Sequence, residues 1–98
     1  MTKKINLHLI SDSTGETLSS VSRAVLSQFE DVESLDFVWP LVRTKSQIKK
    51  IIESVSKNPG IVLYTILDEM LLNKLIDYCD LSNLPCIPAL DNIIHKFS

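Results

Sequence analysis

The chain has 98 residues, 45% of them hydrophobic and 22% charged, with a formal net charge of -2. This length and composition predict one globular domain over residues 1–98, shorter than a typical α/β enzyme that binds a nucleotide and a second substrate. The mild, dispersed negative charge argues against a nucleic-acid surface.

The chain opens with an apolar run, residues 5–10, that predicts a first strand. A polar loop, Ser11–Thr17, leads into a predicted helix from Glu16 to about Gln28. Its face toward a sheet is predicted from apolar residues at helical spacing, namely Leu18, Val21, Val25 and Phe29. Leu35–Trp39 then predicts a second strand, and Pro40 ends it, which suits a position at or near a sheet edge.

A second helix is predicted where Thr44 or Ser46 can act as the N-cap. Its apolar face consists of residues at i, i+3, i+4 and i+7, namely Ile48, Ile51, Ile52 and Val55. Asn58-Pro59-Gly60 ends it. The nearly continuous apolar run Ile61–Leu67 follows and is typical of a strand covered on both faces, so we expect it at the centre of the sheet.

Asp68 stands where the N-cap of a third helix is expected, and the helical pattern continues to about Leu81. Pro85–Leu90 predicts a short fourth strand, and because its prolines cannot donate to a ladder, we expect it at an edge. Asp91 begins a last helical segment. The four strand-to-helix steps predict an α/β three-layer sandwich whose mainly parallel four-stranded sheet has the order 2-1-3-4 with alternating helices.

Ser, Asp or Lys interrupts the apolar stretches well before the ~18 residues of a transmembrane helix, and the N-terminal residues lack a signal-peptide core. We therefore expect a cytoplasmic protein without membrane contact. Cys79 and Cys86 are the only cysteines, and no Cys or His pair lies near them. They are expected to be reduced thiols, and no metal site is expected.

In a parallel sheet, ligands bind beyond the carboxyl ends of the strands, here next to the first and third strands. The loop after the first strand could place hydroxyl and backbone N–H groups at a helix N-terminus, which favours anions. The phosphate or anion-binding candidates are Ser11, Asp12, Ser13, Thr14, Gly15 and Thr17, together with Arg43 after the second strand. Asp68 and Asp91 are secondary candidates, because single acidic residues at helix starts are commonly caps without other function.

Several known phosphate sites do not fit this loop. A Walker A loop needs two glycines five positions apart and a lysine, whereas the only glycines are Gly15 and Gly60. A flavodoxin-like loop would match Thr14–Thr17, but it places Asp12 where the flavin phosphate requires a hydroxyl, so no FMN is expected. A receiver domain needs paired acids after its first strand and a lysine after its last, and neither is evident. His8 and His95 are expected to be structural.

Four motifs carry a resemblance to a known family. They are Ser11–Thr17 after an apolar strand, Trp39-Pro40-Leu41-Val42-Arg43, Asn58-Pro59-Gly60 before an apolar strand that leads to Asp68, and Leu84-Pro85-Cys86 leading to Asp91. In this order and at these intervals, the chain resembles the opening of the pyruvate, phosphate dikinase regulatory proteins, a family that includes the phosphoenolpyruvate synthase regulatory proteins. The resemblance covers essentially all 98 residues.

The resemblance implies a bifunctional cytoplasmic transferase. Members act as ADP-dependent serine/threonine protein kinases that inactivate the dikinase or synthase, and as phosphorylases that use inorganic phosphate to reverse this and yield pyrophosphate. The nucleotide-binding P-loop of the family lies further along a longer chain, so we expect this segment to be inactive alone. A phosphate-binding module and a docking or homodimerisation module, flavodoxin-like or receiver-like in fold, remain alternative functions.

Overall fold

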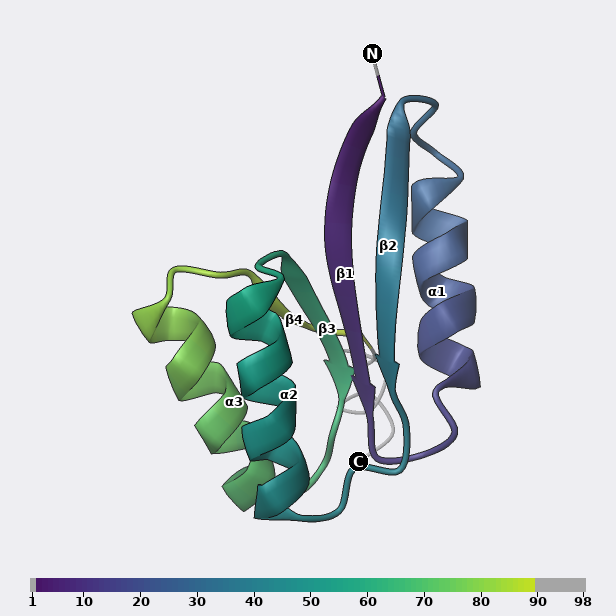
Figure 1. Cartoon of the computed structure of the whole chain (residues 1–98). Coiled ribbons are helices and arrows are strands. Elements are labelled where there is room, and N and C mark those ends of the chain that lie inside the picture. The colour runs from purple at the N-terminus through teal and green to yellow at the C-terminus, as the bar shows by residue number, and fades with distance from the viewer. Residues whose placement is uncertain (1, 90–98) are drawn as a thin grey trace.

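The computed structural model describes residues 2–89 and shows alternating strands and helices (Figure 1). In chain order the elements are β1 (Lys3–Ser11), α1 (Glu16–Leu26), β2 (Val32–Trp39), α2 (Lys45–Lys57), β3 (Ile61–Thr65), α3 (Glu69–Leu81) and β4 (Cys86–Pro88). Asp91, His95 and the predicted last helix lie outside the described residues. No helix within residues 2–89 has the length and apolar character needed to cross a membrane.

The four strands form one parallel sheet in the order β2-β1-β3-β4, which confirms the predicted α/β fold and strand order. β1 and β3 occupy the two central positions. β1 pairs with β2 from Lys3 onward but with β3 only from Leu7 onward, so β1 and β2 extend past the rest of the sheet, as Figure 1 shows. All four strands therefore point their carboxyl ends toward one end of the molecule.

The helices divide between the two faces of the sheet (Figure 1). α2 and α3 lie side by side on one face and enclose the larger apolar cluster, which includes Ile10, Ile51, Val62 and Leu75. α1 covers the other face, where Leu18 packs with two β1 leucines in a smaller cluster. Because the crossover through α1 leaves β1 on one face and the crossover through α2 reaches β3 on the other, the switch point lies between β1 and β3, as predicted.

The predicted inner face of α1 was partly wrong. Leu18 is fully buried, but Val25 is 54% exposed and Phe29, which follows the end of the helix, is 56% exposed. The row that faces the sheet instead runs through Leu18, Ser22 and Leu26 at a spacing of four. The predicted set that includes Val25 and Phe29 and the observed set that includes Ser22 and Leu26 both have a spacing of four residues. Spacing alone therefore does not show which set faces the sheet.

Side chains cap two of the helices as predicted. The Thr44 hydroxyl accepts from the Gln47 N–H at 3.2 Å, while the Gln47 side chain accepts from the Thr44 N–H at 2.9 Å, a complete capping box. The Asp68 carboxylate accepts from the N–H groups of Met70 and Leu71 at 2.9 and 3.2 Å. Thr44, rather than the alternative Ser46, is therefore the cap of α2.

The strand bounds differ in places from those predicted. β2 begins at Val32 instead of Leu35, β3 ends at Thr65 before Ile66 and Leu67, and β4 is only three residues long. His8 is fully buried within β1, where its Nε2 lies 2.8 Å from the Asn58 carbonyl oxygen and its ring stacks on Phe37 at 4.7 Å. These contacts support a structural role for His8.

Candidate functional site

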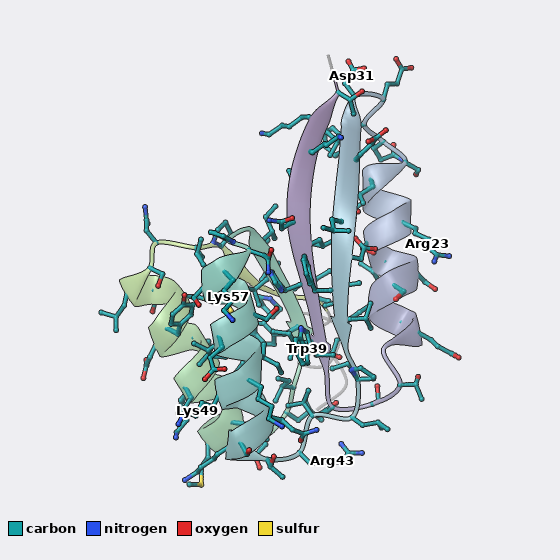
Figure 2. All side chains as sticks on the ribbon, viewed as in Figure 1. Arg23, Asp31, Trp39, Arg43, Lys49 and Lys57 are labelled. Atoms are coloured by element: carbon teal, nitrogen blue, oxygen red, sulfur yellow. The ribbon has the colours of Figure 1, made fainter. Side chains whose placement is uncertain are left out.

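The turns that follow β1, β2 and β3 meet at the carboxyl end of the sheet, which we call the strand-end rim. Ser11 and Thr65 are direct partners where β1 and β3 end. Figure 2 shows Arg43 at this end of the molecule, below the arrowheads of the long strands. The structure thus brings together the regions in which the sequence placed its candidate residues.

Main-chain hydrogen bonds hold the three turns to one another. The Asp12 N–H donates to the Thr65 carbonyl at 3.1 Å, which joins the turn after β1 to β3. The N–H groups of Leu41 and Val42 donate to the carbonyls of Ser13 and Ser11 at 2.8 and 2.9 Å, which joins it to the turn after β2. The rim is therefore one connected piece of backbone.

Ser11 is the centre of a small hydroxyl cluster. Its side chain is almost fully buried. Its oxygen accepts from the Thr65 hydroxyl and from the Ser13 N–H, each at 3.0 Å, and lies 3.0 Å from the Ser13 hydroxyl oxygen. Ser11 therefore already has partners inside the protein, and the cluster shapes the turn from within.

Asp12 and Arg43, both predicted candidates, lie in contact. The Arg43 guanidinium donates to the backbone carbonyl of Asp12, while the Asp12 carboxylate accepts from the Leu67 N–H at 3.1 Å. The carboxylate thus fixes the chain after β3, and the arginine is held beside the turn after β1. No local sequence pattern predicts the contact between Asp12 and Leu67, because the two residues are 55 positions apart.

The N-terminus of α1 lies on the rim without a side-chain cap. Gly15 is the N-cap residue, and its φ of 85° is a left-handed conformation that glycine adopts without steric cost. Thr14 and Thr17 are exposed on either side of it. Among the described residues no side chain caps the first-turn N–H groups of α1, whereas side chains cap those of α2 and α3.

Of the two secondary candidates, Asp68 and Asp91, the structure describes only the first. Asp68 lies on the same rim, but its carboxylate is engaged as the cap of α3, whereas Asp91 lies outside the described residues. Thr65 was missed by the sequence analysis, although a hydroxyl at the end of a central strand is a signal that could have identified it. Within residues 2–89 no three His, Cys, Asp or Glu side chains converge as metal ligands would.

A hollow of about 780 Å³ lies at the other end of the sheet. It is lined by the first residues of β1 and β2 and by the residues that precede β3 and β4, among them Lys4, Leu35 and Pro85. None of the predicted candidates contributes to it. The strand-end rim itself is an open surface with polar groups and exposed apolar side chains, of which Leu41, Leu67 and Met70 are at least half exposed.

Comparisons with known proteins agree with the resemblance that the sequence motifs carry. The sequence pattern of the family described as kinase/pyrophosphorylase matches residues 7–98. The chain is similar to proteins named pyruvate, phosphate dikinase regulatory protein. It is 41% identical to that of Chelativorans sp. strain BNC1 and 46% identical to that of Sinorhizobium medicae, in both cases over 94% of this chain and 34% of the relative. It is 42% identical to that of Erythrobacter litoralis over 93% of this chain. The chain thus spans about a third of the length of these relatives.

Proposed function

The chain belongs to the kinase/pyrophosphorylase family, and on that basis we propose that it forms the N-terminal part of a regulator of pyruvate, phosphate dikinase or phosphoenolpyruvate synthase. The observation that carries the proposal is the 41–46% identity to proteins named as dikinase regulators, over more than nine-tenths of the chain. The whole protein would phosphorylate a threonine of its target with ADP as donor. It would also remove that phosphoryl group with inorganic phosphate and release pyrophosphate.

The nucleotide would be held elsewhere in the whole protein. Phosphoryl transfer needs groups that neutralise the charge of the phosphates, commonly a glycine-rich backbone loop, a lysine and a metal ion. Residues 2–89 contain only two glycines, Gly15 and Gly60, and neither lies in such a loop with a lysine. This segment does not fit ADP by itself, so we assign it no step of the transfer and expect no kinase activity from it alone.

The part assigned to this segment is the binding of a phosphate group at the strand-end rim. The uncapped N–H groups of α1 and the exposed hydroxyls of Thr14 and Thr17 could receive an anion, and Arg43 is held nearby. Asp12, Ser11 and Ser13 would serve as the internal supports of that surface, since their side chains already bond within the protein. A phosphate here would suit the phosphorylase direction, which consumes inorganic phosphate.

The first test is enzymatic. We expect the 98-residue chain, incubated with ADP and the phosphohistidine form of the dikinase, to produce no phosphothreonine detectable by mass spectrometry. The full-length regulator of Sinorhizobium medicae, treated in the same way, serves as the positive control. Turnover by the chain alone would contradict the assignment of the nucleotide site to another part of the protein, and failure of the full-length relative would contradict the proposed activity.

The second test is a titration with inorganic phosphate followed by amide NMR. We expect the N–H signals of Glu16, Thr17 and Leu18 to shift, and Arg43→Gln to weaken binding by about tenfold, as loss of one charge-assisted contact does. The amides in the last turn of α2, at the opposite end of that helix from Arg43, are the internal control and should not respond. If the signals of α1 stay unchanged, the rim is instead a docking or dimerisation surface. That role is the one favoured by the exposed Leu67 and Met70.

A further inference from the structure

The two cysteines of the chain lie in contact in the structure. Cys79 belongs to the last turns of α3 and is fully buried, whereas Cys86 begins β4, is partly exposed and packs against the apolar cluster that contains Cys79. The side chains of Cys79 and Cys86 interact with each other at this cluster, and neither thiol is in a disulfide. This pair takes no part in the strand-end rim described above.

The backbone on both sides of the pair is fixed. The Leu84 N–H donates to the Cys79 carbonyl at 2.8 Å, and the Ser82 N–H donates to the Tyr78 carbonyl at 3.0 Å, so the turn after α3 is closed onto the helix. The Val62 N–H donates to the Pro85 carbonyl at 2.9 Å, which holds the chain just before Cys86 against β3. The two sulfurs are thus positioned together by the fold, and little conformational freedom remains to be lost if they bond.

The two thiols differ in accessibility and in acidity. The hydrogen bond from Cys86 lowers the pKa of the Cys79 thiol, while that same bond, followed by burial, raises the pKa of the Cys86 thiol. Cys86 is the more exposed residue of the pair, because it is partly exposed whereas Cys79 is fully buried. An external reagent is therefore expected to react at Cys86 before Cys79.

We propose that Cys79 and Cys86 are a dithiol–disulfide pair that exchanges with low-molecular-weight disulfides and joins α3 to β4 when oxidised. In the first step the Cys86 thiol loses its proton to water, and the resulting thiolate attacks one sulfur of the reagent. The S–S bond of the reagent breaks, and the released reagent thiolate takes up a proton from water. In the second step the Cys79 sulfur attacks the Cys86 sulfur of the mixed disulfide and expels the second reagent thiol, which takes the proton from Cys79. Two protein thiols are oxidised and one reagent disulfide is reduced to two thiols.

Oxidation would add a covalent link where β4 is held in the described sheet only by β3. β4 is three residues long and contains Pro88, so its ladder is short. The disulfide would tie this strand to the last turns of α3, and excess thiol would reverse the link.

The test uses the whole chain in its folded state with oxidised glutathione as the reagent. We expect the intact mass to fall by two hydrogen atoms, with no glutathione adduct accumulating and no thiol left for alkylation. Cleavage before Asp80 places the two cysteines on separate peptides, which should remain joined until a reductant is added. A covalent dimer, a stable adduct at both cysteines, or oxidation only in denaturant would overturn the proposal.

Matched variants distinguish the first attack, assigned to Cys86, from the second attack, assigned to Cys79. Cys79→Ala should trap the mixed disulfide at Cys86, because the second attack is lost. Cys86→Ala should react at least about tenfold more slowly than the wild-type chain, because the remaining thiol is buried. Equal reaction rates of the two variants would contradict the assigned order, and circular dichroism establishes that each is folded. The outcome does not depend on the regulatory function proposed above.

Discussion

Gly60 shows how closely two backbones approach at the start of β3. A Cβ atom at this position would lie 2.8 Å from both the carbonyl carbon and the Cβ of Asn6, within the backbone of β1. Asn6 also donates to the Pro59 carbonyl at 3.2 Å, so the two chains are held in place at this point. Only a residue without a side chain fits this close approach.

We predict that Gly60→Ala lowers the free energy of unfolding by about 3 kcal/mol, because the rigid backbone of β1 cannot move away from the new methyl group. Gly15→Ala is the matched control. A Cβ there would meet Val38 at an ordinary 3.6 Å, so the cost comes only from the φ of 85° and should be about 1 kcal/mol. Urea denaturation with a common m-value measures both. A loss at Gly60 no larger than that at Gly15 would contradict the close approach.

At this scale the sequence predicted residue types better than contacts. Arg43 and Asp12 were both predicted at the rim and do meet there, because the carboxyl ends of neighbouring parallel strands must lie together. The partner of the Asp12 carboxylate, the N–H of Leu67, could not be predicted, since any backbone group near the end of β3 would satisfy it equally. The contact between Cys79 and Cys86 likewise depends on where a short turn places β4 against α3.

Among the elements, α2 has the clearest sequence pattern and the best-defined start. Its capping box is joined to the preceding turn, since the Gln47 side chain accepts from the Arg43 N–H at 2.6 Å and donates to the Leu41 carbonyl at 3.2 Å. Leu41 adopts a left-handed φ of 54°, which is unfavourable for a leucine, and these bonds help to hold it. The cap therefore orders the turn after β2 as well as the helix.

We predict that Thr44→Ala costs about 1 kcal/mol of stability, the usual effect of losing an N-cap side chain. Ser46→Ala is the control, because Ser46 is an exposed residue within the first turn of the same helix and should change stability by less than about 0.5 kcal/mol. Thermal unfolding of the two variants beside the wild-type chain measures the difference. Equal losses would show that Thr44 is not the functional cap.

Element types were predicted well and element bounds less well. Periodicity identified α2 and α3, and the long apolar run identified β3 as a central strand. The early start of β2 at Val32 was missed because Glu33 and Ser34 have little strand propensity; this part of the strand forms through pairing with β1. The exposure of Val25 was missed for a similar reason, because packing against the sheet determines which side of α1 is buried.

For the whole molecule, the unequal covering of the two sheet faces sets the order of stability. Within residues 2–89, two helices and the larger apolar cluster cover one face, whereas α1 is the one helix on the other, with Leu18 as its one fully buried apolar side chain. Ser22, also on the inner side of α1, is buried with its hydroxyl bonded to the Ser19 carbonyl at 2.9 Å and adds little apolar area. Hydrophobic stabilisation follows the buried apolar area, so α1 is the least strongly anchored helix.

Native-state hydrogen exchange should therefore reveal a local opening of α1. We predict that its amides exchange with a free energy about 1–2 kcal/mol lower than those in the middle of α2, because regions with fewer buried apolar contacts open first. Exchange at several low urea concentrations distinguishes a local opening, which hardly depends on urea, from global unfolding. Equal protection of α1 and α2 would contradict the claim that α1 is anchored by less buried apolar area than α2.

The hydrogen bonds that join the three turns of the strand-end rim have a thermodynamic consequence. Asp12 is already bonded to Thr65, and Leu41 to Ser13, before anything binds. Much of the entropy cost of ordering a recognition surface has therefore been met during folding. A molecule that binds this preorganised surface would lose mainly its own translational and conformational entropy. A larger part of the free energy of its contacts would then contribute to affinity.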